Sequence, residues 1–307
     1  MGFALSTSWN AFRHTHGKTI LQEIKKLGFS KLELSFNLTE EIVAQIEQEI
    51  RKNRKFSITS VHNFCPIPDG FPREKALPDC YSLASCNEVE RLQAVSYTKK
   101  SIDTALRVGA QAVVVHCGRV DIPDHTRTLI DLYELGRKHS KEFLSLRDAM
   151  IREREVSVRS FLTRALRSLE ELSGYAASHK IVLGIETRFY HREIPSLEEM
   201  RVIFHTFKNS WLRYWHDTGH AQVMEYLGFC RHTDYLEELG NEMGGIHLHD
   251  VTGCIDHQAP GVGELDFSLL KRYLKEETIK VIEPHHPATA QEIQEAKALL
   301  TQQFLLS

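Results

Sequence analysis

The sequence lacks a surplus of positive charge, a long apolar run and any Cys-x-x-Cys pair. Its 307 residues carry a formal net charge of −3, whereas proteins that bind nucleic acids usually present a basic surface. No apolar run approaches the roughly 20 residues that span a bilayer, and the first residues lack the basic and apolar regions of a signal peptide. We therefore expect a cytoplasmic protein without a membrane or nucleic-acid partner.

Cysteine is also scarce, with six residues in the whole chain. A chain of this length can bury a core without disulfide bonds, so we expect reduced, mostly structural thiols. The composition, 42% hydrophobic and 26% charged, is ordinary for a soluble protein with a hydrophobic core.

Short β-rich runs alternate with longer amphipathic segments along the chain. Eight runs are typical of strands, at residues 3–7, 31–36, 57–62, 112–117, 181–187, 212–217, 244–250 and 279–284. Strands that alternate with helical or irregular sequence predict an α/β fold, a (β/α)8 TIM barrel that forms a single domain over residues 1–307. An open, doubly wound sheet is the alternative.

Helices are predicted between these runs, and two segments exceed a minimal barrel. The clearest helical segments are 38–50, 87–109, 196–207 and 289–304, the first two preceded or opened by the cap-forming residues Thr39 and Asn87. Residues 119–160 predict an extra helical insertion after the fourth strand, in which 128–146 reads as one helix. This insertion could be a lid, a dimer arm or a solvated helical hairpin. Residues 64–86 predict a long loop.

Side chains that bind metals or move protons stand at or near the ends of seven predicted strands. They are Glu33, His62, His116, Glu186, Asp217 with His220, His247 with His249, and Glu283 with His285. In a barrel these ends converge on one face, where active sites are built. Side chains two apart on a strand share a face, so Glu186 and Arg188 can both point inward. The spacing of Asp217 and His220 suits a strand that ends at Asp217 and turns through Gly219.

Four of these groups, Glu186, Asp217, His247 and Glu283, come from four consecutive predicted strands. Three carboxylates and an imidazole suit Mn²⁺ or Mg²⁺, and Zn²⁺ and Co²⁺ also fit. Without a metal ion, buried carboxylates would repel one another and raise each other's pKa. The alternative is that one or more of them pairs with Arg188 or a lysine.

Several motifs resemble those of a known superfamily over nearly the whole chain. They are GIETR (184–188), WHDTGH (215–220), IHLHD (246–250), HQAPGVGELDF (257–267) and VIEPHH (281–286). These segments resemble the xylose-isomerase-like TIM-barrel superfamily, which includes sugar isomerases and epimerases. The GxG of residues 261–263, followed by Asp266 and Phe267, resembles a loop that closes the rim of the site.

The resemblance implies a divalent-metal-dependent isomerase or epimerase that acts on a small sugar or sugar derivative. The metal ligands would be Glu186, Asp217, His247 and Glu283, with Mn²⁺ favoured. Glu186 and Glu283 would also be catalytic, transferring a proton through an enediolate. The substrate-binding residues would be His62, His116, Arg188, His220 and His257. A homodimer or homotetramer is expected.

The same residues are also similar to those of endonuclease IV, a zinc-dependent phosphodiesterase that acts on abasic DNA. His62, His116, His220 and His257 would then be additional metal ligands. One expected aspartate is displaced, because Ile255 stands two residues before His257 and the acid follows at Asp256. A loop could absorb this one-residue shift, whereas on a strand the shift would turn the acid away from the site. A third possibility is a barrel that binds a metal without catalysis.

Overall fold

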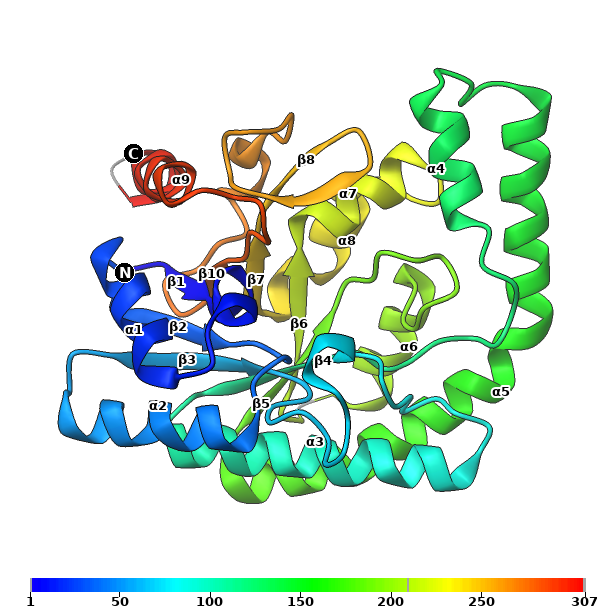
Figure 1. Cartoon of the computed structure of the whole chain (residues 1–307). Helices are drawn as coiled ribbons and strands as arrows, with labels where there is room; N and C mark the ends of the chain where they lie inside the picture. Colours follow the sequence, from blue (N-terminus) through cyan, green and yellow to red (C-terminus); the bar gives the residue numbers. More distant parts are fainter. Residues whose placement is uncertain (1, 209, 306–307) are drawn as a thin grey trace.

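Eight parallel strands form a closed barrel in the computed structural model, which describes residues 2–208 and 210–305 (Figure 1). The strands are β1 Ala4–Ser6, β2 Lys31–Leu34, β3 Ser57–His62, β4 Ala112–Val115, β5 Val182–Glu186, β6 Leu212–Asp217, β7 Met243–Leu248 and β10 Ile279–Ile282. Their order around the barrel follows the chain, and β10 pairs with β1 to close it. The predicted (β/α)8 barrel is confirmed, and the open-sheet alternative is wrong.

Helices follow most strands and lie on the outside of the barrel (Figure 1). They are α1 Gly17–Lys26, α2 Glu40–Lys52, α3 Glu88–Val108, α4 Thr126–Glu134, α5 Lys141–His179, α6 Leu197–Thr206, α7 Thr218–Tyr226, α8 His232–Leu239 and α9 Ala290–Leu305. The predicted caps form, since Thr39 accepts a backbone hydrogen bond at the start of α2 and Asn87 does so at the start of α3. Among the described residues, no helix combines the length and apolar character needed to cross a membrane.

Two helices, rather than one, follow β4 in the region where residues 128–146 predict a single helix. The helix α4 ends at Glu134, Gly136 has a φ of 69°, and Ser140 caps the start of α5. Figure 1 shows α4 beside the first part of α5, and the two helices are in contact. That residues 119–160 form an insertion stays a prediction, as does the single domain over residues 1–307.

The barrel interior below the strand ends is filled by the indole of Trp215. This side chain is fully buried and packs with Ala4, Ala112, Val114 and Val281. A Cβ atom would lie 2.1 Å from the indole at Gly245 and 2.5 Å from it at Gly184, so both positions require glycine. Because Trp215 and Asp217 share a face of β6, the packed interior becomes the floor under Asp217.

An antiparallel hairpin, β8 Asp250–Thr252 and β9 Ile255–Gln258, follows β7. The sequence does not predict this hairpin. The Asp250 carboxylate accepts backbone N–H groups of Val251, Gly261 and Leu265 at 2.8–2.9 Å, which ties the next loop to the hairpin. The hairpin therefore holds residues 256–257 over the end of the barrel.

Candidate functional site

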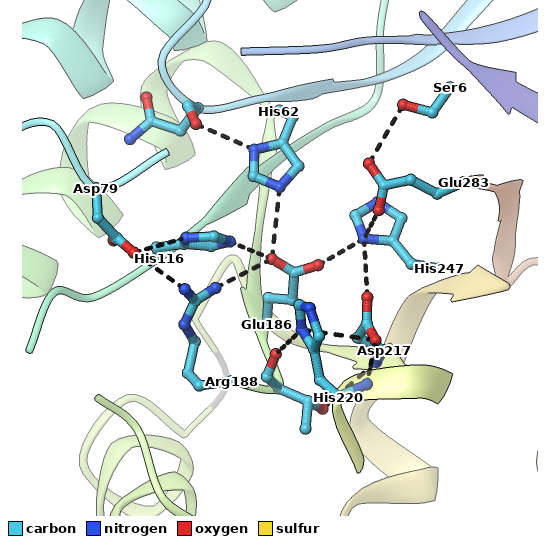
Figure 2. Close-up of polar contacts among 12 residues, drawn as sticks. Ser6, His62, Asp79, His116, Glu186, Arg188, Asp217, His220, His247 and Glu283 are labelled. Carbon is cyan, nitrogen blue, oxygen red and sulfur yellow. Dashed lines mark hydrogen bonds and ion pairs between the residues drawn. The ribbon is translucent and has the colours of Figure 1, made fainter. Parts of the chain in front are cut away.

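The predicted site residues gather at the C-terminal end of the barrel, beside a cavity of about 460 Å³ (Figure 2). Those that line the cavity are His62, His116, Glu186, Arg188, His220, His257 and Glu283. Asp217 and His247 are fully buried next to them. A cavity of this size, lined by convergent polar groups, is typical of a small-molecule site.

Three carboxylates converge on one nitrogen of His247. Its Nδ1 lies 2.5 Å from Glu186, 2.9 Å from Glu283 and 3.8 Å from Asp217. One ring nitrogen carries at most one hydrogen, so it cannot donate to all three carboxylates. The four residues each offer a ligand atom, and these atoms lie within 4.8 Å of one another. Three buried anions around one imidazole are a donor set that fits a divalent cation.

The other nitrogen of His247 is held by Glu33. The Glu33 oxygens lie 3.0 and 3.2 Å from His247 Nε2, and one of them also accepts a hydrogen bond from Ser60 Oγ at 2.7 Å. Such a carboxylate behind a metal-binding histidine orients the ring and selects its tautomer. Burial lowers the pKa of His247, but Glu283, Glu33 and Glu186 together raise it well above its usual value.

Glu186 is held from its other side by His116 and Arg188. Its carboxylate lies 2.5 Å from His116 Nε2 and 3.5 Å from Arg188 Nη1, and His116 Nδ1 lies 3.3 Å from Asp79 (Figure 2). Burial and Arg188 lower the pKa of His116, yet Asp79 and Glu186 raise it above its usual value. Burial alone would raise the pKa of Glu186, but His247 and His116 hold it well below its usual range.

Arg188 is paired within the site. Its guanidinium lies 3.0 Å from Asp79 and 2.9 Å from Glu193, in addition to its contact with Glu186. The guanidinium of Arg188, which was predicted to bind substrate, therefore already contacts three carboxylates of the protein. Sequence reasoning missed Asp79 and Glu193 because both lie on loops, away from the strand ends.

His62 presents an unprotonated nitrogen to Glu186 if its ring is neutral. Its Nδ1 donates to the Asn63 carbonyl at 3.0 Å, and its Nε2 lies 3.5 Å from the Glu186 carboxylate. A lone pair that faces a carboxylate is unfavourable unless a cation or proton lies between them. His62, Glu186 and His247 accordingly form a second group of donors that could hold a metal ion.

A third donor group combines Asp217, His220, His249 and His257. The His249 ring is already satisfied, because its Nδ1 accepts the His257 N–H at 2.9 Å and its Nε2 donates to Asp217 at 2.9 Å. The His220 ring donates from Nδ1 to the Thr187 carbonyl at 2.9 Å, which leaves Nε2 as an acceptor. Burial raises the pKa of Asp217, but His220 and His249 hold it well below its usual range.

Asp256 points toward this third group. Its carboxylate lies 2.9 Å from His257 Nδ1 and 3.6 Å from His220 Nε2. The one-residue shift is absorbed here, because His257 has a φ of 55° and this left-handed conformation interrupts the alternation of β9. Burial lowers the pKa of His257, but Asp256 raises it to about 9.

The wall of the cavity also contains residues that the sequence does not predict. They are Phe36, Leu77, Pro78, Arg119, Asp124, Arg127, Phe189, Tyr190 and Arg192, besides Asp79 and Glu193, whereas the lining residue His285 was named with the strand ends. Several of them belong to the loops after β4 and β5. The only available signal is position, since loops that follow barrel strands lie at the same end as the site.

The fold agrees with comparisons to known proteins. The model of the family described as xylose isomerase-like TIM barrel matches residues 21–303. No match was found among curated proteins.

Solved structures of similar fold include several sugar epimerases. A D-tagatose 3-epimerase-like protein is 19% identical, with a TM-score of 0.65 over 99% of this chain and 97% of that one. The 3-keto-D-glucoside 4-epimerase from E. coli is 16% identical, with a TM-score of 0.68 over 98% and 99% of the two chains. The IolI protein with a bound zinc atom is 12% identical, with a TM-score of 0.64 over 98% of this chain and 97% of that one. The chain belongs to the xylose isomerase-like TIM barrel family.

Proposed function

We propose that the protein is a divalent-metal-dependent isomerase or epimerase of a small sugar or sugar derivative. The observation that carries this proposal is the convergence of Glu186, Asp217 and Glu283 on Nδ1 of His247 beside the cavity. The epimerase names of the structural neighbours support a carbohydrate substrate, and the zinc-bound neighbour supports a metal in this fold. Mn²⁺ is favoured because oxygen donors dominate the set, while Zn²⁺, Mg²⁺ and Co²⁺ also fit.

Proton transfer is assigned to Glu186 and Glu283. A divalent cation held by these two residues with Asp217 and His247 would supply Lewis-acid polarisation of the substrate carbonyl. One glutamate removes the proton from the adjacent carbon and produces an enediolate, and the other returns a proton. Return to the opposite face gives an epimer. The two carboxylates offer oxygens within 4.8 Å of each other, close enough to serve one substrate.

Neighbouring side chains orient the two glutamates. His116 and Arg188 contact the Glu186 carboxylate, and Ser6 Oγ donates to Glu283 at 3.3 Å. Such contacts hold a catalytic group at its working position before the substrate arrives. Arg188 is thereby assigned to positioning rather than to direct binding of substrate.

Unpaired polar atoms in the cavity suit the hydroxyl groups of a sugar. His285 Nε2 is buried with no hydrogen-bond partner among the described residues, and His220 Nε2 lies 3.6 Å from Asp256, beyond hydrogen-bond distance. Buried polar atoms are costly when left unsatisfied, so a polyhydroxy ligand would stabilise them. The predicted roles of His62, His116 and His257 in substrate binding stay predictions, as does a homodimer or homotetramer.

Metal content and proton exchange test this function together. Protein purified without chelators should contain about one divalent ion per chain, measured by mass spectrometry of the bound elements. A panel of ketoses and aldoses in D2O should reveal exchange of the substrate's carbon-bound proton. Glu186→Gln and Glu283→Gln should each slow this exchange by about 10²–10⁴-fold. Glu171→Gln is the control, since that carboxylate is 46% exposed and pairs with Lys99. Wild-type exchange rates in both site variants would show that the assignment is wrong.

An endonuclease IV-like phosphodiesterase is the second candidate. The two further donor groups, which contain His62, His220 and His257, favour it because that activity needs more than one metal ion. Two or three zinc ions per chain, together with cleavage of abasic-site DNA, would establish this function instead. The hydrogen bonds that already satisfy His249 and the pairing of Asp256 with His257 reduce the need for a third ion.

A further inference from the structure

Two arginines on the cavity wall have no carboxylate partner. Arg119 follows β4 and Arg127 lies in the first turn of α4, and both side chains line the cavity. Within residues 2–208 and 210–305, neither guanidinium forms an ion pair with an acidic side chain. Both side chains are exposed, so the cavity wall offers two guanidinium groups that are open to a ligand.

The other two arginines that line the cavity are paired with carboxylates of the protein. Arg188 is paired with Asp79 and Glu193 at 3.0 and 2.9 Å. Arg192 is paired as well, because its Nε lies 3.3 Å from the Asp124 carboxylate. Arg119 and Arg127 are therefore the two cavity arginines that lack such a partner among the described residues.

Aromatic contacts position Arg127 without cancelling its charge. Its guanidinium carbon lies 5.7 Å from the centre of the Phe189 ring and 5.9 Å from that of Tyr190, and it donates to the Tyr190 hydroxyl at 3.2 Å. Stacking of this kind holds a planar guanidinium in place and leaves most of its N–H groups free. Phe189 and Tyr190 belong to the loop after β5 that also carries Arg192. The two loops therefore bring three arginines to one cavity.

We propose that the substrate carries an anionic group, a phosphate monoester or a carboxylate, which Arg119 and Arg127 bind away from the reacting carbonyl. This inference rests on the proposed isomerase or epimerase function. Guanidinium groups bind the oxygens of phosphate and carboxylate through paired, charge-assisted hydrogen bonds. A neutral sugar offers no anionic group to these two guanidinium groups.

The arrangement also orders the substrate within the cavity. The carboxylates Glu186 and Glu283, which are to transfer the proton, line the same cavity as the arginines. An anionic tail bound by the arginines would fix which carbon of the chain reaches the two glutamates. Binding energy from this remote group would be used to orient the reacting centre.

The test uses the full-length protein and the double variant R119Q/R127Q. R152Q is the matched control, because Arg152 is an exposed arginine on α5 that does not line the cavity. Thermal melting of each variant checks the fold, and R119K/R127K keeps the charge but removes the planar guanidinium. Calorimetry measures the binding of inorganic phosphate. Proton exchange in D2O measures kcat/KM for a neutral ketohexose, its 6-phosphate and the related ketohexuronate.

We expect the wild type to prefer one of the two anionic sugars over the neutral ketohexose by about tenfold or more. R119Q/R127Q should lose this preference and bind inorganic phosphate at least about tenfold more weakly, with an intermediate loss in R119K/R127K and none in R152Q. The 6-phosphate and uronate arms decide which anion is recognised. Equal use of the neutral sugar, or a preference that survives in R119Q/R127Q, would overturn the inference.

Binding without turnover separates this inference from the proposed function. If no sugar exchanges protons but phosphate binding still depends on Arg119 and Arg127, the anion site stands and the proposed function fails. Phosphate binding that is absent, or equal in R119Q/R127Q and the wild type, overturns the anion site. Tighter binding of an abasic-site DNA duplex than of every sugar, with the same arginine dependence, would overturn the small-substrate assignment.

Discussion

Replacing Glu33 by glutamine tests whether the buried carboxylate behind His247 controls metal binding. Glu33 is fully buried, and its oxygens contact His247 Nε2 at 3.0 and 3.2 Å and Ser60 Oγ at 2.7 Å. Glutamine has almost the same shape, so the change removes a negative charge with little change in volume. Its amide oxygen can still accept a hydrogen bond from His247, and we expect the fold to be retained.

The expected loss follows from the role of Glu33 as the partner of a metal-binding histidine. Removing such a partner typically weakens metal binding by about 10–100-fold, which corresponds to roughly 1.4–2.7 kcal/mol. Glu33→Gln retains a neutral hydrogen bond, so we expect a loss of about tenfold. Glu33→Ala leaves His247 Nε2 and Ser60 Oγ without their acceptor, so we expect a loss of about 100-fold.

A competition titration with a chromophoric chelator measures the affinity for Mn²⁺ and Zn²⁺ in each variant. Thermal unfolding without metal checks that the apo-protein is folded, and Glu171→Gln controls for the loss of a surface charge. If Glu33→Gln and Glu33→Ala both bind metal as tightly as the wild type, the reasoning is refuted. The ion would then not depend on a ring of His247 held by Glu33.

Two further predictions concern stability. Burial lowers the pKa of His232 from 6.5 to about 4. Its Nδ1 donates to Gln222 and its Nε2 accepts from His216. The unfolded chain therefore takes up a proton on this residue at higher pH than the folded chain. The free energy of unfolding should fall between about pH 6.5 and pH 4, by at most about 3 kcal/mol from this group, and denaturant titrations should show a shallower pH dependence for His232→Gln. An identical dependence in the two proteins would contradict this account. Gly245→Ala places a Cβ atom 2.1 Å from the Trp215 indole, so we expect the free energy of unfolding to fall by about 1–3 kcal/mol. An unchanged melting temperature would show that the barrel interior rearranges without cost.

Much of the barrel could be predicted from local sequence patterns. The predicted strands at 57–62 and 212–217 coincide with β3 and β6. Runs of this kind are short and bounded by loops, and their residue types favour extended backbone. The helix that begins after Thr39 was equally predictable, because a capping hydroxyl followed by acidic residues satisfies the first backbone N–H groups.

The hairpin β8–β9 and the break between α4 and α5 could not be predicted in the same way. Residues 250–258 contain no long alternating run, and their pairing depends on the loop that Asp250 holds. The break depends on Gly136 and Ser140, whose residue types suit a turn but are also tolerated in helices. Where the local sequence preferences are this weak, packing against the rest of the chain decides the structure.

Part of the candidate site could be predicted from the sequence and part of it could not. The donors at the strand ends, such as Glu186 and Asp217, could be predicted from the sequence, because the parallel strands of a barrel bring their ends together whatever the course of the loops. The wall formed by Asp79, Glu193 and the arginines is different, since these residues lie on loops. Their positions depend on how those loops fold over the barrel.

The chain order therefore specified which donors stand at the end of the barrel, whereas the folded structure selected how they are paired. Glu33, Glu186, His247 and Glu283 are far apart in sequence, and closure of the barrel alone brings three carboxylates around one imidazole. The left-handed backbone at His257 likewise depends on the hairpin and not on residue type. Spacing along a strand fixes the face on which a side chain lies, but distances between strands and loops arise only when the whole chain packs.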